Sequence, residues 1–107
     1  MEYKIRLAFL TVFPVPAIEI LNRLVKKYNI TTMLVIPHST REILTLLKVD
    51  RRISIFLLKK SIKSYLSLIK ELIRFSPNII HSYSGGGLFG LTMLPILLYF
   101  VKCKKFL

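Results

Sequence analysis

The sequence predicts an α/β fold, a Rossmann-like parallel sheet of about four strands with helices on its faces. Short uncharged runs rich in Ile, Leu and Val alternate with segments whose apolar residues recur at helical spacing. This alternation continues along most of the 107 residues, which favours βα units joined by right-handed crossovers. No composition shift, repeat or linker divides the chain, so we expect residues 1–107 to form a single domain.

The first part of the chain predicts two strands with a helix between them. Residues 4–13 are mostly apolar and lack glycine, as expected of a strand that is buried on both faces. Pro14 and Pro16 end this strand and open a helix, since proline is tolerated in a first turn. Asn29 is expected to close the helix. Residues 30–36, β-branched and uncharged, then form the second buried strand.

The next part predicts two helices and two further strands. Ser39 and Glu42 have the spacing of a capping box at the start of a short helix. Residues 53–58 form a third strand, Ser61 caps a longer helix, and residues 78–82 form a fourth strand. The apolar stripe predicted on the longer helix comprises Ile62, Tyr65, Leu66, Ile69, Leu72 and Ile73.

The fourth strand leads into the most informative segment, "PNIIHSYSGGG" at residues 77–87. Three glycines let the backbone turn through positive φ and bring a ligand close to bare amides. A helix that follows them would direct free N–H groups and its positive dipole end at an anion or a sugar oxygen. Ligands bind at such strand ends in open α/β sheets. The predicted ligand-binding residues here are His81, Tyr83, Ser84, Gly85, Gly86 and Gly87.

This segment also carries a family resemblance. Extended to "PNIIHSYSGGGLFGL", it resembles the N-terminal, acceptor-side domain of the group-one, family-four-like glycosyltransferases of GT-B fold. "KIRLAFLTVFPVP" is similar to their first strand and the loop after it, which implies that Pro14 is a substrate-binding residue. "ITTMLVIPHS" is similar to their second strand.

The resemblance implies an enzyme that transfers a sugar from a nucleotide-sugar donor to a glycan, lipid or small-molecule acceptor. In that family the donor sits mainly on a second domain with a carboxylate-bearing motif, and neither is visible in this sequence. The chain would therefore be an incomplete domain, whether a fragment, a split subunit or a degenerate copy, and inactive without a partner domain. A truncated sheet would also leave apolar surface that favours self-association.

The sequence departs from the family pattern at two positions. Tyr83 stands where the family often has a second histidine near the transfer centre, and tyrosine is a poor base near neutral pH. Asn78 stands where the family commonly has a structural aspartate. For these reasons no catalytic residue is assigned. The loop at residues 13–16 lacks a glycine fingerprint and no Walker sequence is present, which argues against a dinucleotide site or nucleotide hydrolysis.

The chain is strongly basic, with 17 Lys and Arg against 5 Asp and Glu and a formal charge of +12. This charge attracts phosphates or anionic lipid, although a compositional bias alone also accounts for it. We expect the pairs Arg51–Arg52 and Lys59–Lys60 to be solvated. Asp50, which sits beside Arg51, is expected to form an ion pair or to lie in a solvated turn. No specific nucleic acid is expected to bind, since interleaved exposed aromatic residues are missing.

The C-terminal part leaves two alternatives open. Residues 88–101 carry no charge and predict either a buried or interfacial helix or a membrane span. The second alternative leads to a different function: a small basic membrane-associated or scaffolding protein with a C-terminal apolar anchor. Cys103 is the only cysteine, and His38 and His81 alone make a poor metal site, so we expect no metal and no cofactor. With no signal peptide apparent, a cytoplasmic location is expected.

Overall fold

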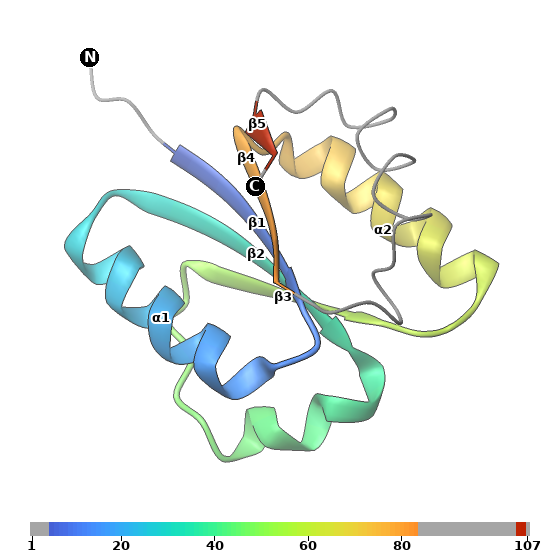
Figure 1. Cartoon of the computed structure of the whole chain (residues 1–107), viewed down its shortest axis with the longest axis horizontal. Helices are drawn as coiled ribbons and strands as arrows, with labels where there is room; N and C mark the ends of the chain where they lie inside the picture. The colour runs from blue at the N-terminus through green and yellow to red at the C-terminus, as the bar shows by residue number, and fades with distance from the viewer. Residues whose placement is uncertain (1–4, 84–104, 107) are drawn as a thin grey trace.

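The computed structural model describes residues 5–83 and 105–106, which form a parallel sheet with helices on both faces (Figure 1). The strands follow the order β3-β2-β1-β4-β5, and every neighbouring pair is parallel. This arrangement confirms the predicted Rossmann-like α/β class, with a two-residue strand added at one edge. The strands are β1 (Ile5–Thr11), β2 (Ile30–Pro37), β3 (Ile53–Leu58), β4 (Ile79–Tyr83) and β5 (Lys105–Phe106).

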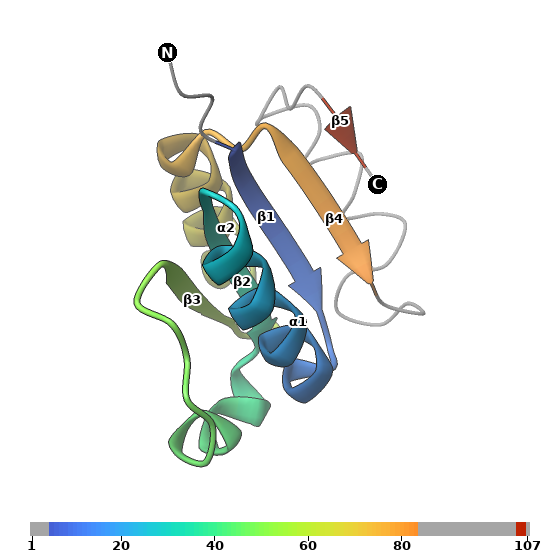
Figure 2. The ribbon, with the colours of Figure 1, turned by 90° about the vertical axis from the view of Figure 1, so that its left-hand side faces the viewer.

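Two α-helices cover opposite faces of the sheet (Figure 2). Helix α1 (Pro14–Lys27) connects β1 to β2, and the 3₁₀ helix η1 (His38–Thr45) lies between β2 and β3. Helix α2 (Ile62–Phe75) then returns the chain from β3 to β4, on the other side of β1. The direction of the connections therefore reverses between β1 and β4, which is the topological switch point of this sheet.

The core consists of two apolar layers, one on each face of the sheet. Because side chains alternate along a strand, Ala8 and Leu10 of β1 face α2 while Phe9 faces α1. This double burial explains why β1 and β2 read as continuous apolar runs. The buried α2 layer contains Ala8, Leu10, Met33, Val35, Leu58, Leu68, Leu72 and Ile80. The buried α1 layer contains Phe9, Ala17, Ile18, Leu21, Val25, Leu34, Ile36 and Ile53.

Hydrogen bonds between Arg6, the second residue of β1, and the residues just before β4 fix the register of these two strands. The backbone N–H of Arg6 donates to Oδ1 of Asn78 at 2.8 Å, and the N–H of Asn78 donates to the carbonyl of Arg6 at 2.8 Å. The Arg6 guanidinium also donates from Nε to the carbonyl of Ser76 at 2.7 Å. From this start Leu7 pairs with Ile79, and two residues later Phe9 pairs with His81.

One of the two predicted helix caps is confirmed and the other is wrong. Ser61 precedes α2, and its Oγ accepts a hydrogen bond from the Ser64 N–H at 3.1 Å. Ser39, in contrast, lies inside η1 and caps nothing. The reason is that β2 extends through Pro37, so η1 begins directly at His38. The hydroxyl of Thr40, one residue after Ser39, donates to the Pro37 carbonyl at 2.7 Å.

Helix α1 ends earlier than the sequence predicts. Its last residue is Lys27, and Tyr28 is already extended, with φ −125° and ψ 158°. The Tyr28 N–H still bonds to the Leu24 carbonyl at 2.9 Å, and the Tyr28 carbonyl accepts from the Ile30 N–H at 2.9 Å. The expected closure at Asn29 is therefore wrong, because the chain turns into β2 through Tyr28.

The predicted stripe on α2 is only partly buried. Leu72 from the stripe and Leu68, which the prediction omitted, are fully buried. Three members of the stripe remain exposed and form what we call the α2 flank: Ile62 at 79%, Leu66 at 59% and Ile73 at 51%. The apolar arc of this helix is wider than the surface that the sheet covers.

Candidate functional site

The carboxyl ends of β1 and β4 meet at the switch point of the sheet. Thr11, the last residue of β1, pairs with Tyr83, the last residue of β4. From β1 the chain goes on to β2 on one side, whereas β5 lies beside β4 on the other side. Open α/β sheets bind ligands in the crevice outside such a switch point. Two pockets lie beside the chain that leaves β1, one lined by Val12 and the other by Phe13.

The first, the His81 pocket, lies on the face of the sheet that α1 covers. His81 of β4 is half-buried beside Phe9 of β1, with ring centroids 4.9 Å apart and planes inclined by 45°. The volume of the pocket is about 630 Å³, within the range of small-molecule sites. It is lined by Phe9, Phe13, Pro16, Ala17, Ile20 and His81.

The chemistry of the His81 pocket is that of an apolar hollow with one polar side chain. Phe13 and Ile20 are each 49% exposed, which is high for large apolar residues. The imidazole of His81 can donate or accept a hydrogen bond, whereas the other lining side chains are apolar. An apolar hollow with a single orienting group is the usual form of a site for a small organic ligand.

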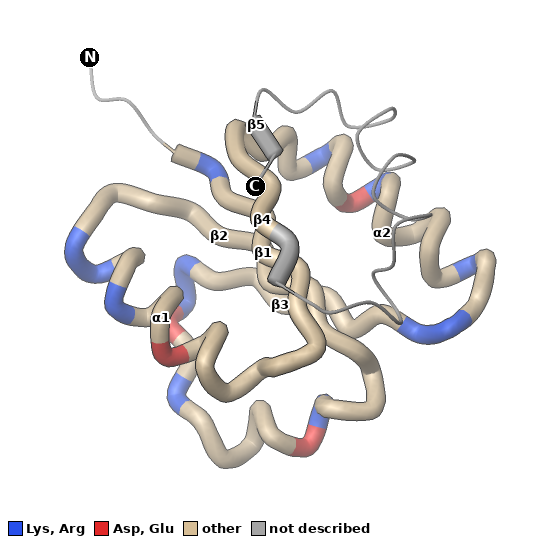
Figure 3. The backbone as a smooth tube through the Cα atoms, in the orientation of Figure 1, with Lys and Arg blue, Asp and Glu red and all other residues tan. Residues whose placement is uncertain are grey.

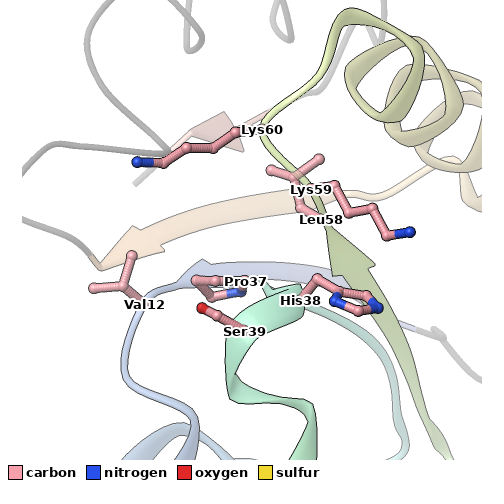
Figure 4. A pocket seen from close by; sticks show the side chains of 7 residues that line it. All are labelled: Val12, Pro37, His38, Ser39, Leu58, Lys59 and Lys60. Atoms are coloured by element: carbon pink, nitrogen blue, oxygen red, sulfur yellow. The ribbon is translucent and has the colours of Figure 1, made fainter.

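The second, the basic pocket, lies at the carboxyl ends of β2 and β3 beside β1 (Figure 4). Its volume is about 570 Å³. In Figure 4, Lys59 and Lys60 extend in opposite directions above the start of η1, where His38 and Ser39 lie. The lining residues are Val12, Pro37, His38, Ser39, Leu58, Lys59 and Lys60.

The residues predicted as a ligand site do not all fall in these pockets. His81 lines one, but it lies two residues before the end of β4 and on the α1 face, not at the outer edge. Pro14 is buried at the first position of α1 and lines neither pocket. Tyr83 closes β4. Ser84, Gly85, Gly86 and Gly87 lie outside the described residues, as does the segment 88–101.

Sequence reasoning missed the residues that surround His81. Phe9 comes from β1, Phe13 is the N-cap of α1, and Ile20 lies in the middle of that helix. All three are far from His81 in the chain. The alternation of side chains in β1 places Phe9 on one face, but only the pairing of β1 with β4 brings that face beside His81. The order of the strands is therefore the information that the sequence pattern lacked.

The only aspartate, Asp50, lies at the amino ends of the strands, opposite the carboxyl ends where the two pockets lie. It precedes β3, and its Oδ1 lies 3.0 Å from Nε of Arg52, so of the two alternatives the ion pair is present, with Arg52 as the partner. The side-chain hydrogen bond from Arg52, together with its backbone N–H, lowers the pKa of Asp50 from 3.8 to about 2. This carboxylate is ionised at neutral pH and holds the turn before β3.

The basic residues are distributed over several elements (Figure 3). In Figure 3 they mark both α1 and α2. Lys59 and Lys60 directly precede Ser61, the N-cap of α2. This distribution agrees with the even spread of Lys and Arg in the sequence. The positive charge is thus not confined to one helix, and two of the basic residues, Lys59 and Lys60, line the basic pocket.

Metal and membrane features are limited in the part of the chain that the structure describes. Residues 5–83 and 105–106 contain no group of three or more His, Cys, Asp or Glu side chains that could hold a metal ion. Within the same ranges, no helix has the length and apolar character required to cross a bilayer. The segment 88–101, with its two alternatives of a buried or interfacial helix and a membrane span, lies outside these ranges.

Known proteins provide no relative for this chain. No protein-family model, curated protein or solved structure matches it. The parallel sheet, its switch point and the two pockets beside β1 are therefore the features that bear on its function.

Proposed function

We propose that this chain is the acceptor-side, N-terminal part of a glycosyltransferase of GT-B fold. The complete enzyme would transfer a sugar from a nucleotide-sugar donor to a glycan, lipid or small-molecule acceptor. The observation that carries the proposal is the position of His81. The histidine of the family-like segment lies beside the switch point and lines a pocket of about 630 Å³.

The His81 pocket suits the acceptor of such a reaction. A sugar ring, or the apolar part of a glycoside, has C–H groups that the rings of Phe9 and Phe13 can bury. Sugar hydroxyls need hydrogen-bond partners in such a place, and His81 supplies one through its imidazole. We assign His81 a binding and orienting role toward the acceptor hydroxyl, and no catalytic role.

The donor would not occupy the His81 pocket. By the family resemblance, the nucleotide of the donor binds mainly to a second domain. The connection between β1 and α1, which borders this pocket, also lacks the glycines with which dinucleotide-binding sheets approach a pyrophosphate. We therefore expect the His81 pocket to bind glycosides and not to bind nucleotide sugars.

Binding of uncharged glycosides tests this function. The isotope-labelled chain is titrated with alkyl glycosides and free disaccharides, and binding is followed by NMR at Phe9, Phe13 and His81. The expected result is saturable shifts at these residues. Replacement His81→Ala should weaken binding about 3- to 10-fold, the range of one neutral hydrogen bond.

The control for this experiment is His38→Ala, because His38 lines the other pocket. This variant should bind glycosides as the original chain does. The proposal is wrong if no glycoside shifts the His81 pocket. It is equally wrong if both histidine variants weaken binding to the same extent, or if a nucleotide sugar alone saturates the pocket.

A further inference from the structure

The basic pocket is lined by residues from three separate connections at one edge of the sheet. Val12 follows β1, while the polar and cationic residues come from the other two connections: His38 and Ser39 open η1 after β2, and Lys59 and Lys60 follow β3 (Figure 4). Since parallel strands end at the same edge, these residues line one pocket although they are distant in sequence. The pocket has room for a small ligand at about 570 Å³.

The positive charge of the basic pocket is not neutralised by the described residues. Ion pairs among these residues join Asp50 to Arg52 and Glu71 to Arg74, and neither involves a lysine. The residues that line the pocket include no carboxylate. Two lysines therefore line a hollow with no counter-charge within the part that the structure describes, and this favours an anion there.

Two hydrogen bonds hold the backbone of Lys59 in place at the rim. The Lys59 N–H donates to Oγ of Ser64 at 2.9 Å, and the Lys59 carbonyl accepts from the Ser61 N–H at 2.9 Å. Ser61 is at the same time the N-cap of α2. The capping of this helix thus fixes the backbone that presents Lys59 and Lys60.

The start of η1 contributes further donors to the same pocket. No side chain caps η1, because the residue before it is Pro37. The first amides of a helix have no partner within the helix and carry its positive dipole end. The hydroxyl of Ser39, freed from the predicted cap, lines the pocket as well. Lysines, a hydroxyl and helix amides together are the donors that bind phosphate in proteins.

We propose that the basic pocket binds a phosphate or diphosphate group. Its position beside the His81 pocket, with Val12 and Phe13 as adjacent residues of one connection, suits a ligand with a phosphate at one end and an apolar or sugar part at the other. For the transferase the ligand would be a phosphorylated acceptor; this last step rests on the proposed function. The phosphate site itself depends only on the pocket.

Titration of the full chain with inorganic pyrophosphate tests the site. The variant Lys59→Gln with Lys60→Gln removes both ammonium groups from the pocket and should weaken binding about tenfold, the effect of one charge-assisted hydrogen bond. The matched control is Lys26→Gln with Lys27→Gln. This pair is also adjacent and exposed, it ends α1 at the opposite edge of the sheet, and its replacement lowers the net charge equally.

The control pair separates a site from general attraction to a basic protein. If both double variants lose affinity equally, the overall charge binds the anion and the proposal fails. Ser39→Ala and His38→Gln keep the charge of the lysines. The proposal also fails if, in these two variants, the NMR signals that shift on addition of pyrophosphate belong only to residues outside the pocket. Circular dichroism of each variant confirms that its helix content is unchanged.

A second titration identifies the source of the phosphate. Vesicles of phosphatidylcholine are compared with vesicles that also contain phosphatidic acid. If the chain binds pyrophosphate but neither kind of vesicle, the ligand is a soluble phosphorylated molecule. If the chain binds vesicles only when they contain phosphatidic acid, the ligand is a lipid phosphate. If neither probe binds in a manner that depends on Lys59 and Lys60, the pocket is not a phosphate site. Because the glycosides used above carry no phosphate, failure here leaves the test of the acceptor pocket intact.

Discussion

At the scale of single residues, Asn78 explains how β4 is placed so that His81 meets Phe9. Its side-chain oxygen accepts the Arg6 N–H at 2.8 Å, and this bond sets the pairing from which Phe9 and His81 become partners. The position needs an acceptor oxygen, which both asparagine and aspartate supply. Asparagine and aspartate are therefore structurally equivalent at this contact.

Replacement of Asn78 by alanine should destabilise the fold. It leaves the part-buried Arg6 N–H without its side-chain acceptor, at a cost of about 1–2 kcal/mol in the free energy of unfolding. Asn78→Asp keeps the acceptor and should stay within about 0.5 kcal/mol of the original chain. Urea denaturation measures both values. Equal losses in the two variants would show that the oxygen does not carry the effect.

A second residue-scale prediction concerns acid stability through Asp50. Its pKa is lowered from 3.8 to about 2 by the hydrogen bonds from the Arg52 side chain and backbone N–H. A lowered pKa means that the folded state prefers the carboxylate. Its contribution is therefore complete above about pH 4 and is lost as the pH falls toward 2. Arg52→Gln should move the pKa of Asp50 back toward 3.8.

NMR titration of the Asp50 carboxyl carbon checks this shift. The neighbouring Arg51 makes no ion pair with Asp50, so Arg51→Gln removes the same charge without removing the contact. We expect the pKa of Asp50 to stay near 2 in that control. Should both variants raise the pKa equally, the cause would be the general positive charge of the turn and not the Arg52 contact.

At the scale of elements, strands were easier to predict from sequence than helix ends and helix faces. β1 and β2 bury residues on both faces of the sheet, so few conformations suit their apolar runs, and the bounds of β1, β2 and β3 came out within one or two residues. Ser39 was misplaced as a cap, because local spacing does not reveal how far β2 continues. The stripe of α2 was misjudged since only contacts decide which part of an apolar arc meets the sheet.

Two adjacent residues of α2 test this account of the helix face. Leu72 is fully buried in the α2 layer, whereas Ile73 is 51% exposed. Leu72→Ala should lower the free energy of unfolding by about 2–5 kcal/mol, because it leaves a cavity in the core. Ile73→Ala, with a similar loss of apolar atoms, should cost less than about 1 kcal/mol. Thermal and urea unfolding of the pair provide the comparison, and similar losses would contradict the assigned face.

At the scale of the whole molecule, the site depends on information that the sequence pattern does not contain. His81 was predicted from its segment, and its position before a strand end follows from the apolar run that precedes it. Its neighbour Phe9 and the lysines of the basic pocket come from other connections, which the order β3-β2-β1-β4 brings together. A periodic pattern gives the elements and their faces, but the strand order arises from packing of the whole chain.

Two opposing forces govern the behaviour of this molecule in solution. The net charge of +12 keeps copies apart, and salt screens this repulsion over a distance of about 10 Å at 0.1 M. The α2 flank, in contrast, exposes Ile62 at 79% and Leu66 at 59%, and apolar surface of this kind favours association. We therefore expect the chain to be monomeric at low salt and to associate as the salt concentration rises.

Substitution of Leu66 by lysine should reduce this association, because it removes an apolar group from the centre of the α2 flank and adds a charge. Ser67→Lys is the matched control: it adds the same charge at the next exposed position of α2 but leaves the flank intact. Sedimentation velocity across a range of salt concentrations compares the three proteins. The control should still associate at high salt, where charge repulsion is screened, while Leu66→Lys remains monomeric. If the two variants behave alike, charge and not the α2 flank controls association. If salt has no effect on the original chain, its charge does not hold copies apart.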